Sequence, residues 1–248
     1  MQNSRYWINR IGISKTNLAT TLVAIENAIE LKEYGYICVT NSRTCYLANQ
    51  DPDYRQIQNN SILTVPDGIP LVWIAHQKGF NEVEKVSGKD LMNALFDISV
   101  EKGYSHYFYG STPETIELIK SNLKIQYPNL DIKGIISPPF YSLDKFNIDE
   151  IRKEINGLKP TFFWCGLGAP KQEQLISLLQ PKLDITICVG VGLAFEYFAG
   201  TVKRAPLWMQ KNGLEWMYRL IQQPKKINRS IRPLSWIVFK LLSLYLKK

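Results

Sequence analysis

Short apolar runs alternate with amphipathic segments along most of this chain, and this alternation limits the fold more than any other feature. The apolar runs have the composition of buried strands and are YICVTN at 36–41, SILTVPDG at 61–68, YSHYFYGS at 104–111, LDIKGII at 130–136, TFFWCGLG at 161–168 and LDITICVGVG at 183–192. The segments between them have helical spacing, as in residues 16–35 and 89–103. Strands that alternate with helices predict an α/β domain with a largely parallel sheet.

The four cysteines indicate a reducing compartment. They form no CxxC pair, so neither a zinc site nor a disulfide framework is indicated. Cys38, Cys165 and Cys188 lie inside the apolar runs and are expected to be reduced core residues. Residues 1–17 contain no apolar stretch of signal-peptide length. These features predict a cytoplasmic protein, and 248 residues with 45% hydrophobic content suffice for a full core.

Basic residues are concentrated toward the C-terminus. Residues 201–248 hold eleven Lys and Arg and one acid, Glu215, whereas the first 200 residues hold 19 Lys and Arg and 21 acids. The sequence therefore predicts a near-neutral α/β body over 1–200 and a basic appendage over 201–248. Such an appendage favours a polyanionic partner, either a nucleic acid or an anionic membrane surface.

Polar or glycine-rich residues follow five of the apolar runs. They are Thr40-Asn41, Asp67-Gly68, Gly110-Ser111, the stretch from Gly166 to Gln172, and Gly190 with Gly192. Strand ends need turn residues in any case, so each of these alone carries little weight. Parallel sheets bind ligands beyond the carboxyl ends of their strands, and five such ends at one edge predict a shared pocket.

Two of these strand ends carry groups suited to chemistry. Asp67 lies between Pro66 and Gly68 in a favoured turn triplet, and the alternative to a turn role is a catalytic carboxylate at the pocket. Lys171 and Gln172 lie in the first turn of an expected helix. A lysine is unfavourable there unless an anion is nearby, and a glutamine offers a donor and an acceptor to a nucleobase edge. An ordinary exposed pair is the alternative for these two residues.

Several longer motifs resemble one family. In order along the chain, the motifs similar to the WecG/TagA/CpsF family of bacterial glycosyltransferases (glycosyltransferase family 26) are TVPDGIPLVW at 64–73, VSGKDLM at 86–92, YFYGSTPETIELIKSNLKIQYPNLDIKG at 107–134, GLGAPKQE at 166–173 and GVGLAFEYFAGTVKRAPLWMQKNGLEWMYRLIQQP at 190–224. The resemblance extends from about residue 10 to residue 232. It implies a two-lobed Rossmann-like body and a C-terminal basic helical appendage that touches the membrane.

The resemblance also implies an activity. Members of the family are inverting enzymes that transfer a sugar from a UDP-sugar to an undecaprenyl-diphosphate-linked glycan, for teichoic acid, enterobacterial common antigen, capsule or exopolysaccharide. The donor is left open among ManNAc, ManNAcA, glucose and glucuronate types. The expected location is the cytoplasmic side of the bacterial cell membrane, with peripheral attachment. A homo-oligomer is possible, and no cofactor is expected.

The resemblance assigns roles to individual residues. Asp67 matches the proposed catalytic base, and Thr40 and Asn41 match polar positions of the same pocket. The expected substrate-binding residues are Gly110, Ser111, Gly168, Ala169, Pro170, Lys171, Gln172, Gly190, Gly192 and Arg204. The residues expected to meet the lipid diphosphate or the membrane are Arg219, Lys226, Arg229, Trp236 and Phe239. The three basic ones share one face if their segment is a single helix.

A few positions depart from the family pattern. Lys85 stands where an arginine is usual, Glu196 replaces a more usual aspartate, and Ser111 stands where glycine is more frequent. The segment IISPPF at 135–140 replaces a Gly-Tyr-Phe-like segment. These departures concern the donor sugar more than the reaction class.

The expected chemistry does not require a metal ion. Direct inversion needs a base for the acceptor hydroxyl, and helix N-termini and basic side chains can stabilise the departing UDP. Asp51 and Asp53 form a DxD-like pair that is expected in a loop after a helix, so no metal site is predicted. His76 and His106 are the only histidines and are expected to be structural.

The last apolar segment, SWIVFKLLSLYLKK at 235–248, is too short to span a bilayer, which needs about 20 residues. With the basic residues before it, this segment predicts a helix lying in an anionic membrane interface. The alternative is a helix packed on the body or on another subunit. A nucleic-acid-binding protein is a rival explanation of the basic residues, but it leaves the strand-end pocket unexplained, and the membrane interpretation expects no nucleic acid. A nicotinamide-dependent enzyme is a second rival, and the chain lacks the GxGxxG motif for it.

Overall fold

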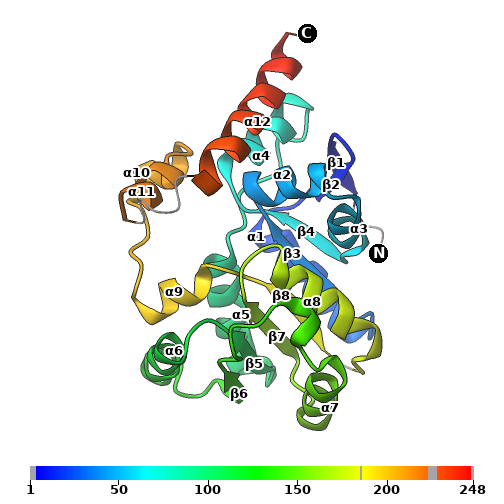
Figure 1. Ribbon diagram of the computed structural model, residues 1–248, viewed down its shortest axis with the longest axis vertical. Coiled ribbons are helices and arrows are strands. Elements are labelled where there is room, and N and C mark those ends of the chain that lie inside the picture. Colours follow the sequence, from blue (N-terminus) through cyan, green and yellow to red (C-terminus); the bar gives the residue numbers. More distant parts are fainter. Residues whose placement is uncertain (1–3, 185, 223–227, 247–248) are drawn as a thin grey trace.

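Six parallel strands form the main sheet of the computed structural model, which describes residues 4–184, 186–222 and 228–246, and their side chains except those of 228–230. In sheet order the strands are β4 (Leu63–Pro66), β3 (Tyr36–Thr40), β8 (Ile187–Gly190), β7 (Phe162–Gly166), β5 (Ser105–Gly110) and β6 (Asp131–Ile136). Every neighbouring pair runs parallel. The predicted α/β class with a parallel sheet is confirmed (Figure 1).

Helices cover both faces of this sheet. One face packs against α1 (Leu18–Glu30), α5 (Gly88–Lys102), α6 (Pro113–Gln126) and α9 (Ala194–Ala199), and the other against α3 (Pro52–Asn60), α7 (Ile148–Leu158) and α8 (Lys171–Leu179). In β7, Phe162 and Trp164 belong to the first core, whereas Phe163 and Cys165 belong to the second. Successive side chains of a strand point to opposite faces, so a strand buried on both faces is a continuous apolar run.

The order in which strands are added to the sheet reverses between the neighbouring parallel strands β5 and β7. Helix α6 leads from β5 to the outer strand β6 across one face, whereas α8 leads from β7 to the inner strand β8 across the other. The loops that follow these two strands therefore diverge at the carboxyl edge. Open parallel sheets bind ligands at such reversals.

A third core joins the N-terminal residues to the C-terminal helix. The hairpin of β1 (Arg5–Ile8) and β2 (Ile11–Ser14) packs with α2 (Ser42–Gln50), α4 (Ile69–Gln77) and α12 (Asn228–Tyr245). Ile237 of α12 is fully buried in this core. Helix α12 thus packs on the body (Figure 1), and the domain boundary at residue 200 stays a prediction.

The C-terminal part contains two further helices, α10 (Leu207–Lys211) and α11 (Glu215–Gln222). Short 3-10 turns, η1 (Leu143–Lys145) and η2 (Gln180–Lys182), complete the described elements. Over the described ranges, no helix has both the length and the apolar composition needed to cross a membrane.

The loop expected around Asp51 is wrong, because this residue starts a helix. The Asp51 side chain accepts the N–H groups of Asp53 and Tyr54 at 2.9 and 3.1 Å, and Pro52 occupies the first position of α3. An acidic N-cap followed by proline satisfies free N–H groups and fixes a helical φ. The DxD-like pair is therefore the beginning of a helix.

The buried histidine and the cysteines have partners or surroundings typical of a protein core. His106 of β5 is fully buried, and its Nδ1 accepts a hydrogen bond from Trp164 Nε1 at 3.0 Å. Burial lowers the pKa of His106 to about 3, so the ring is neutral. All four cysteines are buried and form no disulfide, as predicted for Cys38, Cys165 and Cys188 from their positions in apolar runs.

Candidate active site

The carboxyl ends of the six parallel strands lie at one edge of the sheet (Figure 1). The strand ends singled out in the sequence follow one another along this edge, in the order Asp67, Thr40, Gly190, Gly166 and Gly110. Segments that are far apart in the chain are therefore neighbours here.

Asp67 follows β4 directly and begins the turn into α4. Its N–H donates to the carbonyl of Thr40 at 2.7 Å, which ties the turn to the end of β3. Gly68 has a φ of +152°, a conformation that side chains rarely adopt. The Pro-Asp-Gly turn thus has a defined geometry that holds the carboxylate at the edge of the sheet.

Three basic side chains from distant parts of the chain face this carboxylate. The segment of Lys85 is held beside β4 because the N–H of Val86 donates to the carbonyl of Pro66 at 2.8 Å. Arg204 lies between α9 and α10, and Arg219 lies on α11. The positive charge of each of these three side chains lowers the pKa of the carboxylate that follows β4, which is that of Asp67.

Two other acids hold these basic side chains. Arg204 donates two hydrogen bonds to the Asp90 carboxylate, at 2.5 and 2.6 Å. Lys85 and Arg219 share Glu215, at 2.5 and 2.8 Å. Burial opposes the ionisation of Glu215, but the charges of Arg219 and Lys85 outweigh it and lower its pKa to about 2. Glu215 is therefore ionised at neutral pH.

Asp67 differs from these two acids in its contacts. Its carboxylate forms no hydrogen bond or ion pair with any residue in the parts of the chain that the structure describes. Burial raises the pKa of Asp67, and the charges of Lys85, Arg219 and Arg204 limit the rise. A carboxylate without a partner and with a raised pKa suits a general base, because an effective base has a pKa near the working pH.

Gly110 and Gly166 bring the ends of β5 and β7 into close contact. A Cβ atom on Gly110 would lie 2.6 Å from the carbonyl carbon of Gly166, so only glycine fits there. Ser111 follows with a φ of +61°, which glycine adopts more readily than serine. The Ser111 carbonyl accepts a hydrogen bond from Ser137 Oγ at 2.9 Å, which joins this turn to the end of β6.

Gly168, Ala169 and Pro170 form the loop between β7 and α8. Gly168 has a φ of +80° and open space where a side chain would begin. The Ala169–Pro170 peptide bond is cis, and the Ala169 carbonyl accepts a hydrogen bond from Arg43 at 3.1 Å. Because Arg43 lies in the first turn of α2, this bond joins the loop to the end of β3.

Lys171 lies next to the aromatic loop that follows β6. Its Nζ donates to the carbonyl of Tyr141 and lies 5.2 and 4.9 Å from the ring centroids of Phe140 and Phe146. These partners are neutral groups, and among the described residues Lys171 forms no ion pair. Its positive charge is therefore available to an anion at the carboxyl edge.

Gln172 is buried, which the sequence analysis did not anticipate. Its Oε1 accepts the N–H of Gly168 at 3.0 Å, and its Nε2 donates to Glu173 Oε1 at 2.7 Å. A Cβ atom on Gly190 would lie 3.0 Å from this amide, so Gly190 provides room for it. Both polar atoms of Gln172 are engaged inside the protein, so this geometry does not favour the expected contact with a nucleobase.

Thr40 and Asn41 also have partners within the fold. The Thr40 hydroxyl is fully buried and donates to Gln58 Oε1 at 2.5 Å. Asn41 caps α2, and its Oδ1 accepts the N–H groups of Arg43 and Thr44 at 3.0 and 3.2 Å. Both residues border the Asp67 turn, and their catalytic contacts stay predictions.

The basic face expected for the appendage does not form on one helix. Arg219 belongs to α11 and Arg229 to α12, and Lys226 lies outside the described residues. Arg219 joins the cluster around Asp67, where its Nε donates to the Tyr197 hydroxyl at 3.1 Å. Tertiary contact rather than helical periodicity therefore places this arginine.

Trp236 and Phe239 occupy different surroundings on α12. Trp236 packs edge-on against Tyr46 of α2, with ring centroids 6.2 Å apart, because this side of the helix covers the third core. Trp236 therefore contacts the body, and the membrane contact expected for it stays a prediction. Phe239 is 65% exposed, beside the exposed Leu242 and Leu246.

The sequence analysis missed three partners of the site, Asp90, Tyr197 and Glu215. Of the three, Glu215 could most readily have been predicted, because it is the single acid among residues 201–248. An acid alone among eleven basic residues is a reasonable candidate for an internal ion pair.

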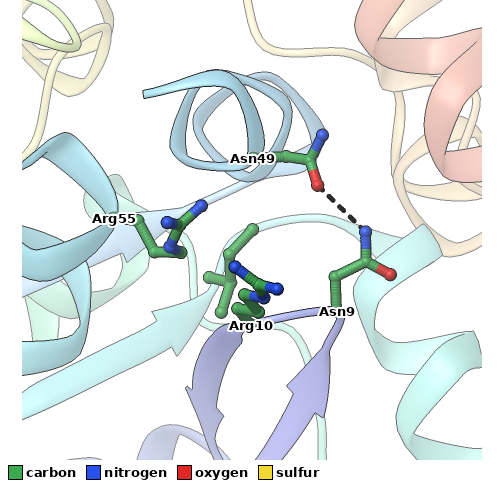
Figure 2. Close-up of a pocket in the computed structure, with 5 residues that line it drawn as sticks. Asn9, Arg10, Asn49 and Arg55 are labelled. Atoms are coloured by element: carbon green, nitrogen blue, oxygen red, sulfur yellow. Dashed lines mark hydrogen bonds between the residues drawn. The ribbon is translucent and has the colours of Figure 1, made fainter. Parts of the chain in front are cut away.

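The described residues contain no group of three or more His, Cys, Asp or Glu side chains that could hold a metal ion. A cavity of about 430 Å³ lies between the hairpin turn and helices α2 and α3, lined by Asn9, Arg10, Ile11, Asn49 and Arg55 (Figure 2). Asn9 donates to Asn49 across it at 2.9 Å. None of its lining residues belongs to the Asp67 cluster or to the loop before α8.

Known proteins resemble this chain over most of its length. The model of the glycosyl transferase WecG/TagA/CpsF family matches residues 6–248. A relative from Bacillus subtilis (strain 168), named N-acetylglucosaminyldiphosphoundecaprenol N-acetyl-beta-D-mannosaminyltransferase, is 29% identical over 227 residues, covering 90% of this chain and 86% of the relative. Proteins of the same name are 28% identical over 227 residues in Bacillus spizizenii (90% and 86% covered) and 27% identical over 194 residues in Staphylococcus aureus strain MW2 (78% and 74% covered). This chain therefore belongs to the WecG/TagA/CpsF family of glycosyltransferases.

Proposed function

We propose that this protein transfers a sugar, with inversion, from a UDP-sugar to a polyprenyl-diphosphate-linked glycan. The observation that carries the proposal is the carboxylate of Asp67, which has no hydrogen-bond or ion-pair partner among the described residues and faces Lys85, Arg204 and Arg219. The names of the relatives point to N-acetylglucosamine on undecaprenyl diphosphate as the acceptor. The same names make a ManNAc-type donor the first one to test.

In this proposal Asp67 is the general base. The acceptor hydroxyl gives its proton to the Asp67 carboxylate while its oxygen attacks the anomeric carbon of the donor. The bond between that carbon and the UDP oxygen breaks on the opposite face, so the configuration is inverted. Ionised Asp67 is needed for this step, and the three basic neighbours favour that form.

The departing UDP carries negative charge that fixed groups of the protein stabilise. The Gly110-Ser111 turn and the loop before α8 flank the reversal between β5 and β7, and each leads into the N-terminus of a helix. Helix N-termini attract phosphate through free N–H groups, and Lys171 adds a positive charge. We therefore propose a transfer that is independent of metal ions.

The same proposal places the acceptor at a membrane surface. Arg204 and Arg219 are the side chains proposed to bind the diphosphate of the acceptor. The diphosphate would compete with Asp90 for Arg204 and with Glu215 for Arg219. The exposed Phe239, Leu242 and Leu246 of α12 give this part of the molecule an apolar surface. An apolar helix side with basic residues around it suits the interface of an anionic leaflet.

A transfer assay tests the proposal. The protein is incubated with a GlcNAc-diphosphate-polyprenol acceptor and, in turn, the UDP derivatives of ManNAc, ManNAcA, glucose and glucuronate, and products are identified by mass spectrometry. We expect one donor to extend the acceptor by one sugar. Absence of product with all four donors contradicts the proposal, and salt-sensitive binding to RNA in the same preparation would favour the nucleic-acid alternative.

Calorimetry with UDP tests the metal-free mechanism separately. We expect UDP to bind with the same Kd in the presence and absence of EDTA, and Lys171→Ala to weaken binding. Exposed Lys120 on α6 offers a control of the same charge change, as Lys120→Ala. Loss of UDP binding in EDTA overturns this part of the proposal.

A further inference from the structure

Glu173 is a buried carboxyl to which the proposed reaction gives no role. It lies in the first turn of α8, directly after Gln172, and its exposed fraction is 0%. Burying an acid away from water is costly unless the group is hydrogen-bonded. Its place beside the loop of Gly168 suggests what the group does.

The Gln172 amide has one orientation that satisfies both of its neighbours. The N–H of Gly168 needs an acceptor, and an ionised Glu173 carboxylate only accepts hydrogen bonds. The amide oxygen therefore faces Gly168 and the amide nitrogen faces Glu173. A flipped amide would place its NH₂ group against an N–H and its oxygen against a carboxylate, so the Gly168 N–H and the ionised Glu173 together set the orientation.

Groups from four other elements face Glu173. They are Tyr54 of α3, Arg43 of α2, Cys38 of β3 and Cys165 of β7. Burial raises the pKa of both thiols, that of Cys165 to about 12, and burial likewise raises the pKa of Tyr54 far above neutrality. Near neutral pH these three groups stay protonated, and Arg43 stays charged.

Hydrogen bonds continue from this group to the Asp67 turn. The Tyr54 hydroxyl accepts a hydrogen bond from Gln58 Nε2 at 3.0 Å, and Gln58 Oε1 accepts one from Thr40 at 2.5 Å. The Thr40 carbonyl in turn accepts the N–H of Asp67. Glu173 Oε2 forms no hydrogen bond of ordinary geometry among the described residues, and the Tyr54 hydroxyl is the group placed to approach it.

We infer that Glu173 is a positioning residue, whose carboxyl holds the Gln172 amide so that Gly168 and the loop before α8 keep the geometry that receives the nucleotide diphosphate. The identity of the ligand rests on the proposed function, whereas the hold on Gly168 is a property of the free protein. Replacing the acid loosens the loop without removing any group that touches substrate.

The hydrogen bond from Gln172 to Glu173, and with it the restraint on Gly168, depends on pH. Burial raises the pKa of Glu173 to about 7, although the hydrogen bonds from Gln172 and Tyr54 and the charge of Arg43 oppose the rise. Raising the pH through 7 ionises Glu173 and strengthens the bond from Gln172, because charged acceptors form stronger hydrogen bonds. The Gly168 N–H is then held more tightly.

Hydrogen exchange of the free protein, followed by NMR, tests the hold directly. We expect the protection factor of the Gly168 amide to rise as the pH passes through 7, and to fall about tenfold in Glu173→Ala. Glu173→Gln keeps an acceptor oxygen and is expected to retain protection without the pH dependence. Ser177→Ala is the control on the same helix, since its hydroxyl donates to the Gln174 carbonyl and has no other hydrogen bond within the described ranges.

UDP calorimetry gives the second measurement. We expect Glu173→Ala to weaken UDP binding about tenfold, and wild type and Glu173→Gln to differ in the pH dependence of their Kd values. Comparing these two proteins cancels the titration of UDP itself. If Glu173→Ala does not fold, the comparison of wild type with Glu173→Gln still decides.

Two results overturn the inference: unchanged Gly168 protection in Glu173→Ala, or the same pH dependence in wild type and Glu173→Gln. A wild-type protein that binds no UDP contradicts the proposed function instead, because Gly168 protection is measured without ligand. The two failures are therefore distinguishable.

Discussion

Two carboxyl groups near the same edge of the sheet, Asp67 and Glu173, have pKa values raised by burial but different neighbours. Asp67 faces the charges of Lys85, Arg219 and Arg204, which limit the rise. Glu173 faces an amide, a hydroxyl, two thiols and one cation, Arg43, and its pKa reaches about 7. Burial therefore raises both pKa values, whereas nearby positive charges limit the rise at Asp67 more than at Glu173.

The two regions also differ in how the chain builds them. The surroundings of Glu173 come largely from the loop before α8 and from α2 and α3, within the body. The surroundings of Asp67 include Arg204, Glu215 and Arg219 from the C-terminal part. The body therefore provides the positioning of the loop, and the C-terminal part adds Arg204, Glu215 and Arg219 to the charge of Lys85 around the proposed base.

The largest expected effect is the loss of turnover on replacing the carboxylate of Asp67, which, unlike that of Glu173, is the proposed base. Asp67→Asn removes the proposed base without changing the size of the side chain, so turnover should fall by about 10²–10⁴-fold. UDP binding should be unchanged, because the loop before α8 is untouched. Asp53→Asn, at an exposed acid of α3, is the control. A variant that turns over at nearly the wild-type rate would return Asp67 to the role of a turn residue.

The second prediction uses stability and concerns Glu173. Its pKa is about 7 in the folded protein against 4.5 as the ordinary value, so the folded state binds the proton more tightly. The free energy of unfolding should therefore fall as the pH rises from 4.5 to 7, by about 3 kcal/mol at most from this group. Glu173→Gln should remove this decline. Urea unfolding across that range measures it, with Glu101→Gln, at an exposed residue of α5, as the control.

A flat wild-type profile between those pH values would show that Glu173 is already ionised in the folded protein across this range. The contrast between the two regions would then disappear.

The third prediction concerns whether the C-terminal part also binds a membrane, in addition to contributing residues to the site. Phe239 is exposed and Trp236 packs on Tyr46. Phe239→Ser should weaken binding to anionic liposomes by roughly tenfold or more, because burying a phenylalanine side chain contributes about 1.5–3 kcal/mol. Trp236→Ser should mainly lower the melting temperature. Flotation and thermal unfolding of both variants test the contrast, and equal flotation of Phe239→Ser and wild type places the membrane contact elsewhere.

The smallest expected effect is a shift in the pH profile of transfer. Glu215 raises the pKa of Asp67 and Lys85 lowers it. Glu215→Gln should therefore move the acid limb of kcat/KM to lower pH, and Lys85→Met should move it to higher pH, each by about one unit or less. Glu114→Gln, at an exposed acid of α6, should leave the limb in place. Shifts in the same direction for both variants would mean that another group controls this limb.

Much of the fold was predictable because local pattern and tertiary burial agree in it. Strands β3, β4, β5, β7 and β8 are buried on both faces, so each is a largely continuous apolar run, and polar or glycine residues mark their ends. The hairpin of β1 and β2 was not anticipated. Its turn, Asn9-Arg10, lacks the glycine of a strong hairpin signal, although Ile8 and Ile11 beside it are buried.

The sequence by itself therefore determined the parallel sheet, the edge that carries Asp67 and the family, since these depend on periodicity and on motifs that are contiguous in the chain. The tertiary structure alone decided which side chains meet at that edge. Arg204 and Asp90 are 114 positions apart, and Arg219 reaches Asp67 through the packing of α11 rather than along one helical face with Arg229. Gln172 turns inward because Gly168 and Glu173 satisfy its amide. The direction of a side chain depends on the partners that the fold brings to it, and no local pattern records those partners.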